Sequence, residues 1–538
     1  MAAGLMRASA VMASGTMVSR LLGFAKAMLL VFAIGQVSSV SGDAFANGNL
    51  LPNTLYMILL GGMLNAVLVP QIVKAAKDPD GGAGYINKVF TLVMTALVIV
   101  TALVIAAAPW IVHLFTLSWG DEQRGLALAF AYWALPQIVF YGLYTMLGEV
   151  LNARSVFGPF TWAPVLNNVI AIAGIIAFIA IYGADSQGTR TPGDWTPTAV
   201  AVLAGSATLG VVAQSLVLFI SWRKAGIRYR PDFKWRGMGL AQTGKIAGWS
   251  LATIVVMQLG GIVTQNVINT ASGAGASALA MQNAWLIFML PHSVIAVSLA
   301  TAYFTRLAGW GQSGKMAEFR ADFSSSARQI SLVMVLSSVV VCSAAPFVSR
   351  VFNLGGTEEQ VQLFTLVLQC YMVGLAAYSF LFIVQRAFYA LSDTRTPFVF
   401  TSVQIGLLIA LSLGLLVLPK EWIGPAYGLA FGASTIVQAL LAVLLLRKRI
   451  GRIDGTRILA SLARFGIAAI PALLAGFGFT VFLGRVFPGY GPFAAVGLAV
   501  LDAMLVLLVY LGALRLLRSP DLAELTGFVA RKLGRTRS

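Results

Sequence analysis

The sequence predicts an all-α, polytopic membrane protein. Hydrophobic residues make up 58% of the 538 residues and charged residues only 10%, whereas about 25% of the residues in a typical soluble domain are charged. Apolar runs of about 20 residues, the length of a helix that crosses a bilayer, recur along the whole chain. Such long runs favour membrane-spanning helices over the alternating pattern of a β-barrel.

Fourteen apolar runs are long enough to cross the membrane. The first is interrupted by Arg20 and is followed at once by the second, which indicates an uncleaved helix rather than a signal peptide. The predicted transmembrane helices cover residues 9–37, 44–73, 86–116, 124–152, 159–183, 197–222, 242–270, 276–307, 323–352, 359–390, 397–418, 425–446, 458–484 and 491–514.

The placement of Lys and Arg predicts the orientation. With the N-terminus in the cytoplasm, 30 of the 37 Lys and Arg fall on the cytoplasmic side or at helix ends facing it, and 5 fall on the other side. Only Arg20 and Lys26 remain within the membrane. This bias predicts a multi-pass protein with both termini cytoplasmic, and it accounts for the net charge of +18 without a nucleic-acid partner.

Two similar segments indicate an internal repeat. EVLNARSVFGPF (149–160) separates spans four and five, and AFYALSDTRTPF (387–398) separates spans ten and eleven, 238 residues later. Repeated halves are the usual architecture of secondary transporters. The sequence therefore predicts two pseudo-symmetric six-helix halves and two extra helices. The predicted parts are an N-terminal half at 1–222, a basic cytoplasmic linker at 223–245, a C-terminal half at 246–449, helices 13 and 14 at 450–518, and a tail at 519–538 with an amphipathic helix over 520–533.

Residues typical of catalytic and metal sites are scarce. Cys342 and Cys370 lie in apolar runs, and His113 and His292 stand alone. We therefore expect neither a metal site nor a cofactor. Acidic residues are scattered rather than clustered, which favours transport over catalysis and predicts that the protein is not an enzyme.

Arg20 and Lys26 are candidate substrate-binding residues. A charged residue within the membrane costs about 2.5–3.5 kcal/mol and usually faces a wet cavity or a partner. Arg20 lies about 17 Å along its helix, near mid-membrane, and its guanidinium suits a phosphate group because it donates two hydrogen bonds at once. Lys26 lies about 120° from Arg20 around an ideal helix, so the two face one cavity only if the helix bends or the cavity is wide. Structural pairing is the alternative for both.

Asp43 and Asn53 are two further candidates, on the second span. Asp43 either stabilises the start of that helix or lines a gate and pairs with Arg20 or Lys26 in one conformation. Asn53 follows Pro52, so its amide either satisfies a carbonyl that the proline leaves unpaired or contacts a ligand.

Ordered motifs at the N-terminus resemble those of the MurJ (MviN) family of lipid II flippases. They are SGTMVSRLLGFAK at 14–26 and DAFANGNLLPNTLYMILLGGMLNAVLVP at 43–70, with AFYALSDTRTP at 387–397. The fourteen spans and the two halves agree with this family, which belongs to the superfamily of multidrug, oligosaccharidyl-lipid and polysaccharide exporters.

The resemblance implies a function and a set of partners. By alternating access, the protein would move lipid II, an undecaprenyl-pyrophosphate-linked disaccharide pentapeptide, to the outer leaflet of the bacterial cytoplasmic membrane for cell wall synthesis. Arg20 matches a family arginine that binds the pyrophosphate, and Lys26, Asp43 and Asn53 match further family positions. Helices 13 and 14 would hold the lipid tail. Membrane lipids and proteins of cell wall synthesis and division are the other implied partners.

The sequence also departs from the family pattern. Tyr56 and Met57 stand where relatives often carry basic residues, and the run 285–291 lacks the Arg and Glu that many carry before Pro291. The alternatives left open are a multidrug or cation antiporter, an exporter of another polyprenyl-pyrophosphate glycan, a membrane glycan transferase and a scaffold of the division machinery. The two membrane cations argue against the cation antiporter.

Overall fold

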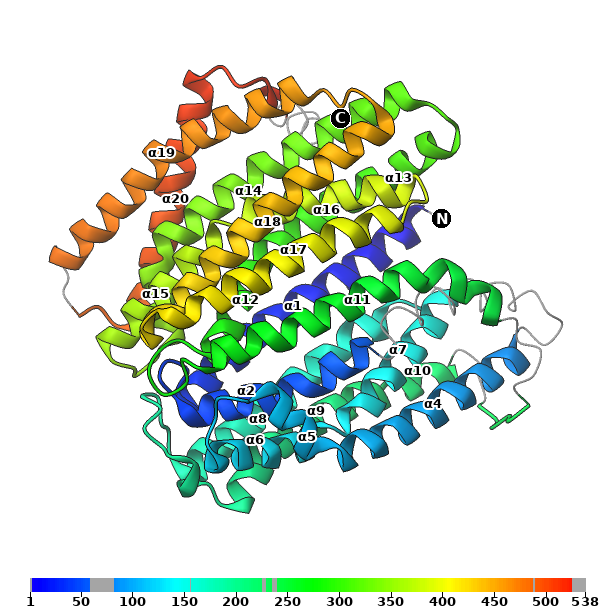
Figure 1. Ribbon diagram of the computed structural model, residues 1–538, viewed down its shortest axis with the longest axis vertical. Helices are drawn as coiled ribbons and strands as arrows, with labels where there is room; N and C mark the ends of the chain where they lie inside the picture. The colour runs from blue at the N-terminus through cyan, green and yellow to red at the C-terminus, as the bar shows by residue number, and fades with distance from the viewer. Residues whose placement is uncertain are drawn as a thin grey trace. The chain divides into compact units, whose positions relative to one another are not determined.

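A computed structural model describes residues 2–58, 82–154, 156–224, 229–234, 240–486 and 489–524 (Figure 1). Within these ranges, side chains are described from residue 11 onward, except those of 13, 224 and 240–247. The described chain is helical, as predicted, and it divides by its contacts into two compact units. The first unit comprises residues 1–273 and 277–279, and the second comprises residues 274–276 and 280–538.

The predicted membrane spans are largely confirmed. Thirteen helices in the described ranges are long and apolar enough to cross a membrane, and each coincides with one predicted span. The second predicted span, 44–73, begins in α2 (Val40–Tyr56), and its part beyond residue 58 lies outside the described residues. The third span is interrupted at Ala107, two residues before Pro109, where α4 gives way to α5. The protein is therefore a multi-pass membrane protein.

The first unit contains the N-terminal helices and α11. Its elements in the described ranges are α1 (Ala2–Ile34), α2, α4 (Ala83–Ala106), α5 (Ala108–Phe115), α6 (Asp121–Ala134), α7 (Gln137–Ala153), α8 (Gly158–Tyr182), the 3₁₀ turn η3 (Pro192–Asp194), α9 (Pro197–Leu216), α10 (Leu218–Lys224) and α11 (Leu240–Asn269). Residues 225–228 and 235–239 of the predicted basic linker lie outside the described residues.

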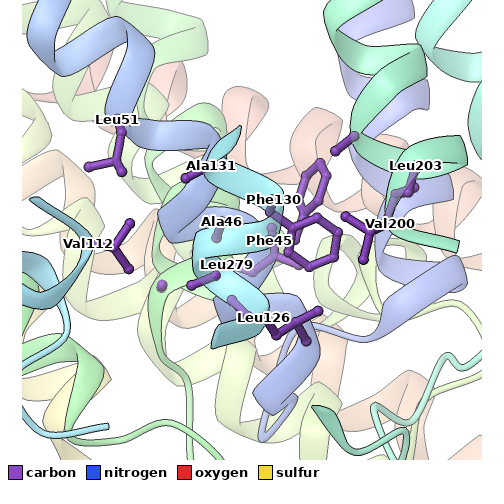
Figure 2. Packing of buried hydrophobic residues seen from close by; sticks show 14 of the residues in the cluster. Phe45, Ala46, Leu51, Val112, Leu126, Phe130, Ala131, Val200, Leu203 and Leu279 are labelled. Atoms are coloured by element: carbon purple, nitrogen blue, oxygen red, sulfur yellow. The ribbon is translucent and has the colours of Figure 1, made fainter. Parts of the chain in front are cut away.

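Aromatic side chains from distant segments form the core of the first unit. Phe45 of α2 meets Phe130 of α6 edge to face, with ring centroids 5.3 Å apart. Trp195 packs against Phe130 at 5.1 Å and stacks on Phe178 of α8 at 5.4 Å. Figure 2 shows Phe45 and Phe130 side by side among aliphatic side chains. Edge-to-face pairs of this kind add to the stabilisation from apolar burial, so this core fixes α2 against α6 and α8.

The second unit contains the remaining helices. They are the larger part of α12 (Ala278–Pro291), one π-helical turn η4 (His292–Ala296), α13 (Val297–Gln312), α14 (Met316–Phe352), α15 (Glu358–Met372), α16 (Leu375–Ala390), α17 (Arg395–Gly414), the 3₁₀ turn η5 (Leu415–Val417), α18 (Lys420–Ile450), α19 (Gly455–Val486) and α20 (Pro492–Leu516). The chain is again helical over 520–524, and the rest of the predicted amphipathic helix lies outside the described residues.

Helices α14, α19 and α20 pack together within the second unit (Figure 1). Asp502 of α20 is fully buried and accepts a hydrogen bond from Ser343 Oγ of α14 at 2.6 Å. Gly476 lets α19 approach α14 closely beside Ser343, since a Cβ at residue 476 would lie only 2.5 Å from the Ser343 Cβ. One oxygen of the intramembrane carboxyl is thus bonded to a neighbouring helix, whereas its Oδ1 is buried without a hydrogen-bond partner in the described ranges.

The two repeat segments form equivalent turns. In the first, Val156 N donates to Leu151 O at 2.9 Å, and in the second, Asp393 N donates to Phe388 O at 3.0 Å. Each bond reaches back five residues, which is a pattern that closes helix C-termini. The Asp393 carboxylate also accepts hydrogen bonds from the backbone N and hydroxyl of Thr396. This turn is therefore held by the aspartate.

We expect Gly374→Ala to destabilise the second unit. Gly374 separates α15 from α16, and a Cβ there would lie 2.9 Å from the Cα of Gly432 on α18. Because backbone atoms cannot yield as a side-chain tip can, the expected loss is about 1–3 kcal/mol of the free energy of unfolding. Gly406→Ala in α17 is the control, since no atom lies within 4 Å of its Cβ position. Equal melting temperatures of the two variants in detergent would contradict this prediction.

Candidate substrate-binding site

Helix α8 determines which side of α1 is covered. Trp162 Nε1 donates to Val11 O at 3.2 Å, and Asn168 Nδ2 donates to Ser19 O at 2.9 Å. Gly15 lies between these contacts, and a Cβ there would lie 2.8 Å from the Trp162 ring. Positions 11, 15 and 19 are four residues apart and therefore share one face of the helix. That face lies against α8.

Arg20 and Lys26 occupy different sides of α1. Both side chains are half-buried. At 100° per residue, Lys26 lies about 20° from Ser19 around the helix, whereas Arg20 lies about 100° from it. Lys26 therefore belongs to the side covered by α8, and Arg20 is turned away from that side. With α8 on the face of residues 11, 15 and 19, regular helix geometry places the two cations on different sides of α1.

Asp43 lies in the first turn of α2 and is fully buried. Its Oδ2 accepts a hydrogen bond from Ser272 Oγ at 2.7 Å, and its Oδ1 accepts one from the Leu279 backbone N at 3.1 Å. Ser39 caps the same turn by accepting a hydrogen bond from Gly42 N at 3.0 Å. These partners are neutral donors, Ser272 from the connection that follows α11 and Leu279 from the first turn of α12. No ion pair of Asp43 is found among the described residues.

Asn53 lies ten residues further along α2 than Asp43, which places it about 15 Å away along the helix axis. Its side chain is exposed and makes no hydrogen bond within the described part of the chain. It therefore does not satisfy the carbonyl that Pro52 leaves unpaired. Tyr56, one turn further along, bonds through its hydroxyl to Thr145 Oγ1 of α7 at 2.7 Å. This end of α2 thus presents an uncharged, polar surface.

A row of hydrogen bonds between α2 and α11 was not identified as a unit from the sequence. Gln265 Nε2 donates to Asn47 Oδ1 at 3.3 Å, and the Asn47 and Asn269 amides bond to each other at 3.1 Å. Gln258 Nε2 donates to Thr54 O at 3.0 Å. Residues 258, 265 and 269 of α11 fall on one face of the helix. This spacing is the signal in the sequence from which the row could have been predicted.

These contacts explain why α11 belongs to the first unit. Asn269 Nδ2 also donates to Phe115 O at 2.8 Å, and Trp119 Nε1 donates to Asn269 O at 2.9 Å. Asn266 bonds to the same stretch, at the end of α5: its Nδ2 donates to Leu114 O at 2.8 Å, and its Oδ1 accepts from Leu117 N at 2.9 Å. Interhelical hydrogen bonds stabilise membrane helix packing by about 0.6 kcal/mol each on average, so the set fixes the end of α11 firmly.

The four predicted residues comprise two cations, a buried carboxylate and an exposed amide. In the described ranges, no three His, Cys, Asp or Glu side chains are grouped as a metal ion would require. A guanidinium such as that of Arg20 can bind an anionic group through two hydrogen bonds, and an exposed amide such as that of Asn53 can bond to polar groups.

Sequence comparison places the chain among transporters. The model of the family described as Lipid II flippase MurJ matches residues 34–496. This range includes Asp43 and Asn53 and begins after Lys26. A probable lipid II flippase MurJ from Rhizobium meliloti is 26% identical over 426 residues, covering 76% of this chain and 75% of that protein. The lipid II flippase MurJ of Burkholderia cenocepacia is 27% identical over 459 residues, covering 83% and 84%.

Structural comparison gives the same fold. A structure of lipid II flippase MurJ in an inward closed conformation matches with a TM-score of 0.71 and 19% identity, covering 97% of this chain and 99% of that one. An inward-facing multidrug resistance MATE family transporter of the MOP superfamily matches with a TM-score of 0.63 and 17% identity, covering 83% and 99%. With the family model spanning most of its length, this chain belongs to the MurJ family of lipid II flippases.

Proposed function

We propose that this protein moves lipid II from the inner to the outer leaflet of the bacterial cytoplasmic membrane by alternating access. The observation that supports this most directly is the match of the MurJ family model to residues 34–496. Arg20 adds a half-buried cation in the first membrane span. The pyrophosphate of lipid II is an anion that matches its planar guanidinium.

We infer distinct roles for the four predicted residues. Arg20 binds the pyrophosphate directly, and the exposed amide of Asn53 donates to polar groups of the head group. Lys26, on the side of α1 that faces α8, raises the local positive potential. Asp43 acts through its bonds to Ser272 and Leu279, which hold the connection after α11 closed and break when the protein opens outward.

We further propose how the chain is organised around transport. Residues 1–222 and 246–449 form the two repeated halves, the linker at 223–245 and both termini lie in the cytoplasm, and helices α19 and α20 hold the lipid tail. The basic tail at 519–538 contacts the inner leaflet. No chemical step is needed, so the protein acts as a transporter without catalysis. Proteins of cell wall synthesis and division are its proposed partners.

Reconstitution tests this function. The purified protein is placed in vesicles with fluorescent lipid II, and an impermeant quencher reports how much of it changes leaflet. We expect the protein to accelerate this movement over empty vesicles. Vesicles that instead accumulate a cationic dye in exchange for protons, without moving lipid II, would favour an antiporter and contradict the proposal.

A further inference from the structure

A cluster of aromatic rings lies inside the second unit. Phe288 of α12 is fully buried, and the rings of Trp285, Tyr371, Tyr378 and Phe431 surround it, with centroids 5.1–6.0 Å from its own. The planes of Trp285 and Phe288 are nearly parallel, at 14°. The other pairs meet at steep angles, which is the favoured geometry for ring edges against ring faces. Each ring is thus held in a defined orientation.

The backbone around the cluster explains why the rings meet. Gly374 and Gly432 allow α16 and α18 to approach within backbone contact, which brings Tyr378 and Phe431 together at 6.1 Å. One turn beyond Phe288, the buried His292 bonds to Ser379 Oγ at 2.9 Å and packs on the Tyr378 ring at 4.8 Å. Tyr378 is therefore positioned from two sides, and the cluster is preformed.

The rim of the cluster is accessible. Trp285, Tyr378 and Phe431 are only half-buried, in contrast to Phe288. Neither the Trp285 indole N–H nor the Tyr378 hydroxyl bonds to another described residue, and neither atom is sealed from the surface. Such groups usually find a hydrogen-bond partner when they are buried, and hydrocarbon offers none. A ligand that offers acceptors could therefore bond to both donors.

Aromatic faces beside a few hydrogen-bond donors are suited to a sugar ring. The C–H groups on one face of a pyranose carry partial positive charge, which is attracted to the negative face of an aromatic ring, while its hydroxyls bond to nearby donors. A pyrophosphate is not suited, because none of the clustered residues is charged and the run 285–291 contains no Lys or Arg. Ligand sites commonly combine an aromatic lining with a few such polar groups.

We propose that Trp285, Tyr378 and Phe431 form a carbohydrate-binding surface that stacks against the disaccharide of the transported lipid. This proposal rests on the proposed function and assigns the sugars to the second unit. It also gives a role to the uncharged residues at positions 285–291. In this chain the aromatic surface recognises the glycan, and the pyrophosphate is left to the cations of α1.

The proposed sugar-binding surface can be tested by comparing the binding of two lipids that differ only in their sugars. Full-length wild-type protein and variants are titrated with undecaprenyl pyrophosphate and with the same lipid carrying the disaccharide. We expect Trp285→Ala to weaken binding of the disaccharide lipid by about tenfold and to leave undecaprenyl pyrophosphate binding unchanged. Trp285→Phe, which keeps a ring but removes the N–H, should fall between wild type and Trp285→Ala.

Trp110→Ala is the matched control, because this tryptophan is 74% exposed on α5 of the first unit; it should leave both affinities unchanged. If Trp285→Ala weakens the binding of both lipids equally, or of neither, the proposal of a sugar-binding surface is wrong, while the proposed function stands. If wild-type protein binds neither lipid, the proposed function itself fails. A normal melting temperature of Trp285→Phe distinguishes lost recognition from misfolding.

Discussion

Replacing Arg20 by alanine is expected to abolish movement of lipid II. Truncating one partner of a buried, charge-assisted contact costs about 2–5 kcal/mol, so head-group binding should weaken by a factor of about 30 or more. Arg20→Lys keeps the charge but loses the two-pronged donor geometry, and it should retain part of the activity. The measurement is growth of cells depleted of their native flippase, together with the leaflet assay on the purified variant.

The other basic residues provide the controls for Arg20. Arg485→Ala removes an exposed charge at the end of α19 and should support growth like wild type. Lys26→Ala should have a smaller effect than Arg20→Ala, since Lys26 lies on the α8 side of the helix and acts only through the potential. Full growth with Arg20→Ala would exclude its role in pyrophosphate binding. Equal losses at Arg20 and Lys26 would indicate that both contact the head group.

The membrane helices were predictable because hydrophobic length is a local property of the sequence. The angle between Arg20 and Lys26 was predictable for the same reason, since six residues on one helix fix it. The partners of Asp43 were not, because Ser272 and Leu279 lie 229 and 236 residues away. The sequence contains Gln258, Gln265 and Asn269 at helical spacing, but only the fold brings them to α2.

The aromatic surface of the second unit illustrates the same limit. Trp285 and Phe288 belong to the run 285–291, in which the sequence shows only an absence of Arg and Glu. Tyr378 and Phe431 follow Trp285 by 93 and 146 residues, and their approach depends on Gly374 and Gly432. Side-chain identity is local, whereas the grouping of side chains depends on which backbones come within contact.

Arg328→Ala is expected to cause the largest loss of stability in the described part of the chain. Arg328 of α14 and Asp521 are 4% and 1% exposed and form an ion pair. Asp521 also accepts a hydrogen bond from Ser461 Oγ of α19 at 2.6 Å. Removing the guanidinium leaves a buried carboxylate without its counter-charge, which costs about 3–5 kcal/mol. The measurement is the melting temperature of the purified protein in detergent.

A double variant separates the effect of the buried charges on stability from the effect of side-chain packing. Arg328→Met combined with Asp521→Leu removes both charges while filling the space, and such exchanges are often neutral or stabilising. The pair of Asp121 and Arg124 supplies the control, because Asp121 is 99% exposed, and Asp121→Ala should cost less than about 1 kcal/mol. A double variant as unstable as Arg328→Ala would show that the ion pair itself, rather than its burial, supports the fold.

The position of this ion pair links stability to the C-terminal segment. Asp521 follows α20, and its neighbour Leu522 packs on the apolar cluster between α14, α19 and α20. Glu524 accepts hydrogen bonds from Ser325 and Gln329 of α14 at 3.3 and 3.4 Å. The segment at 519–524 therefore joins the end of α20 to α14. Arg328→Ala should thus expose it to proteolysis before the rest of the chain unfolds, whereas Asp121→Ala should not.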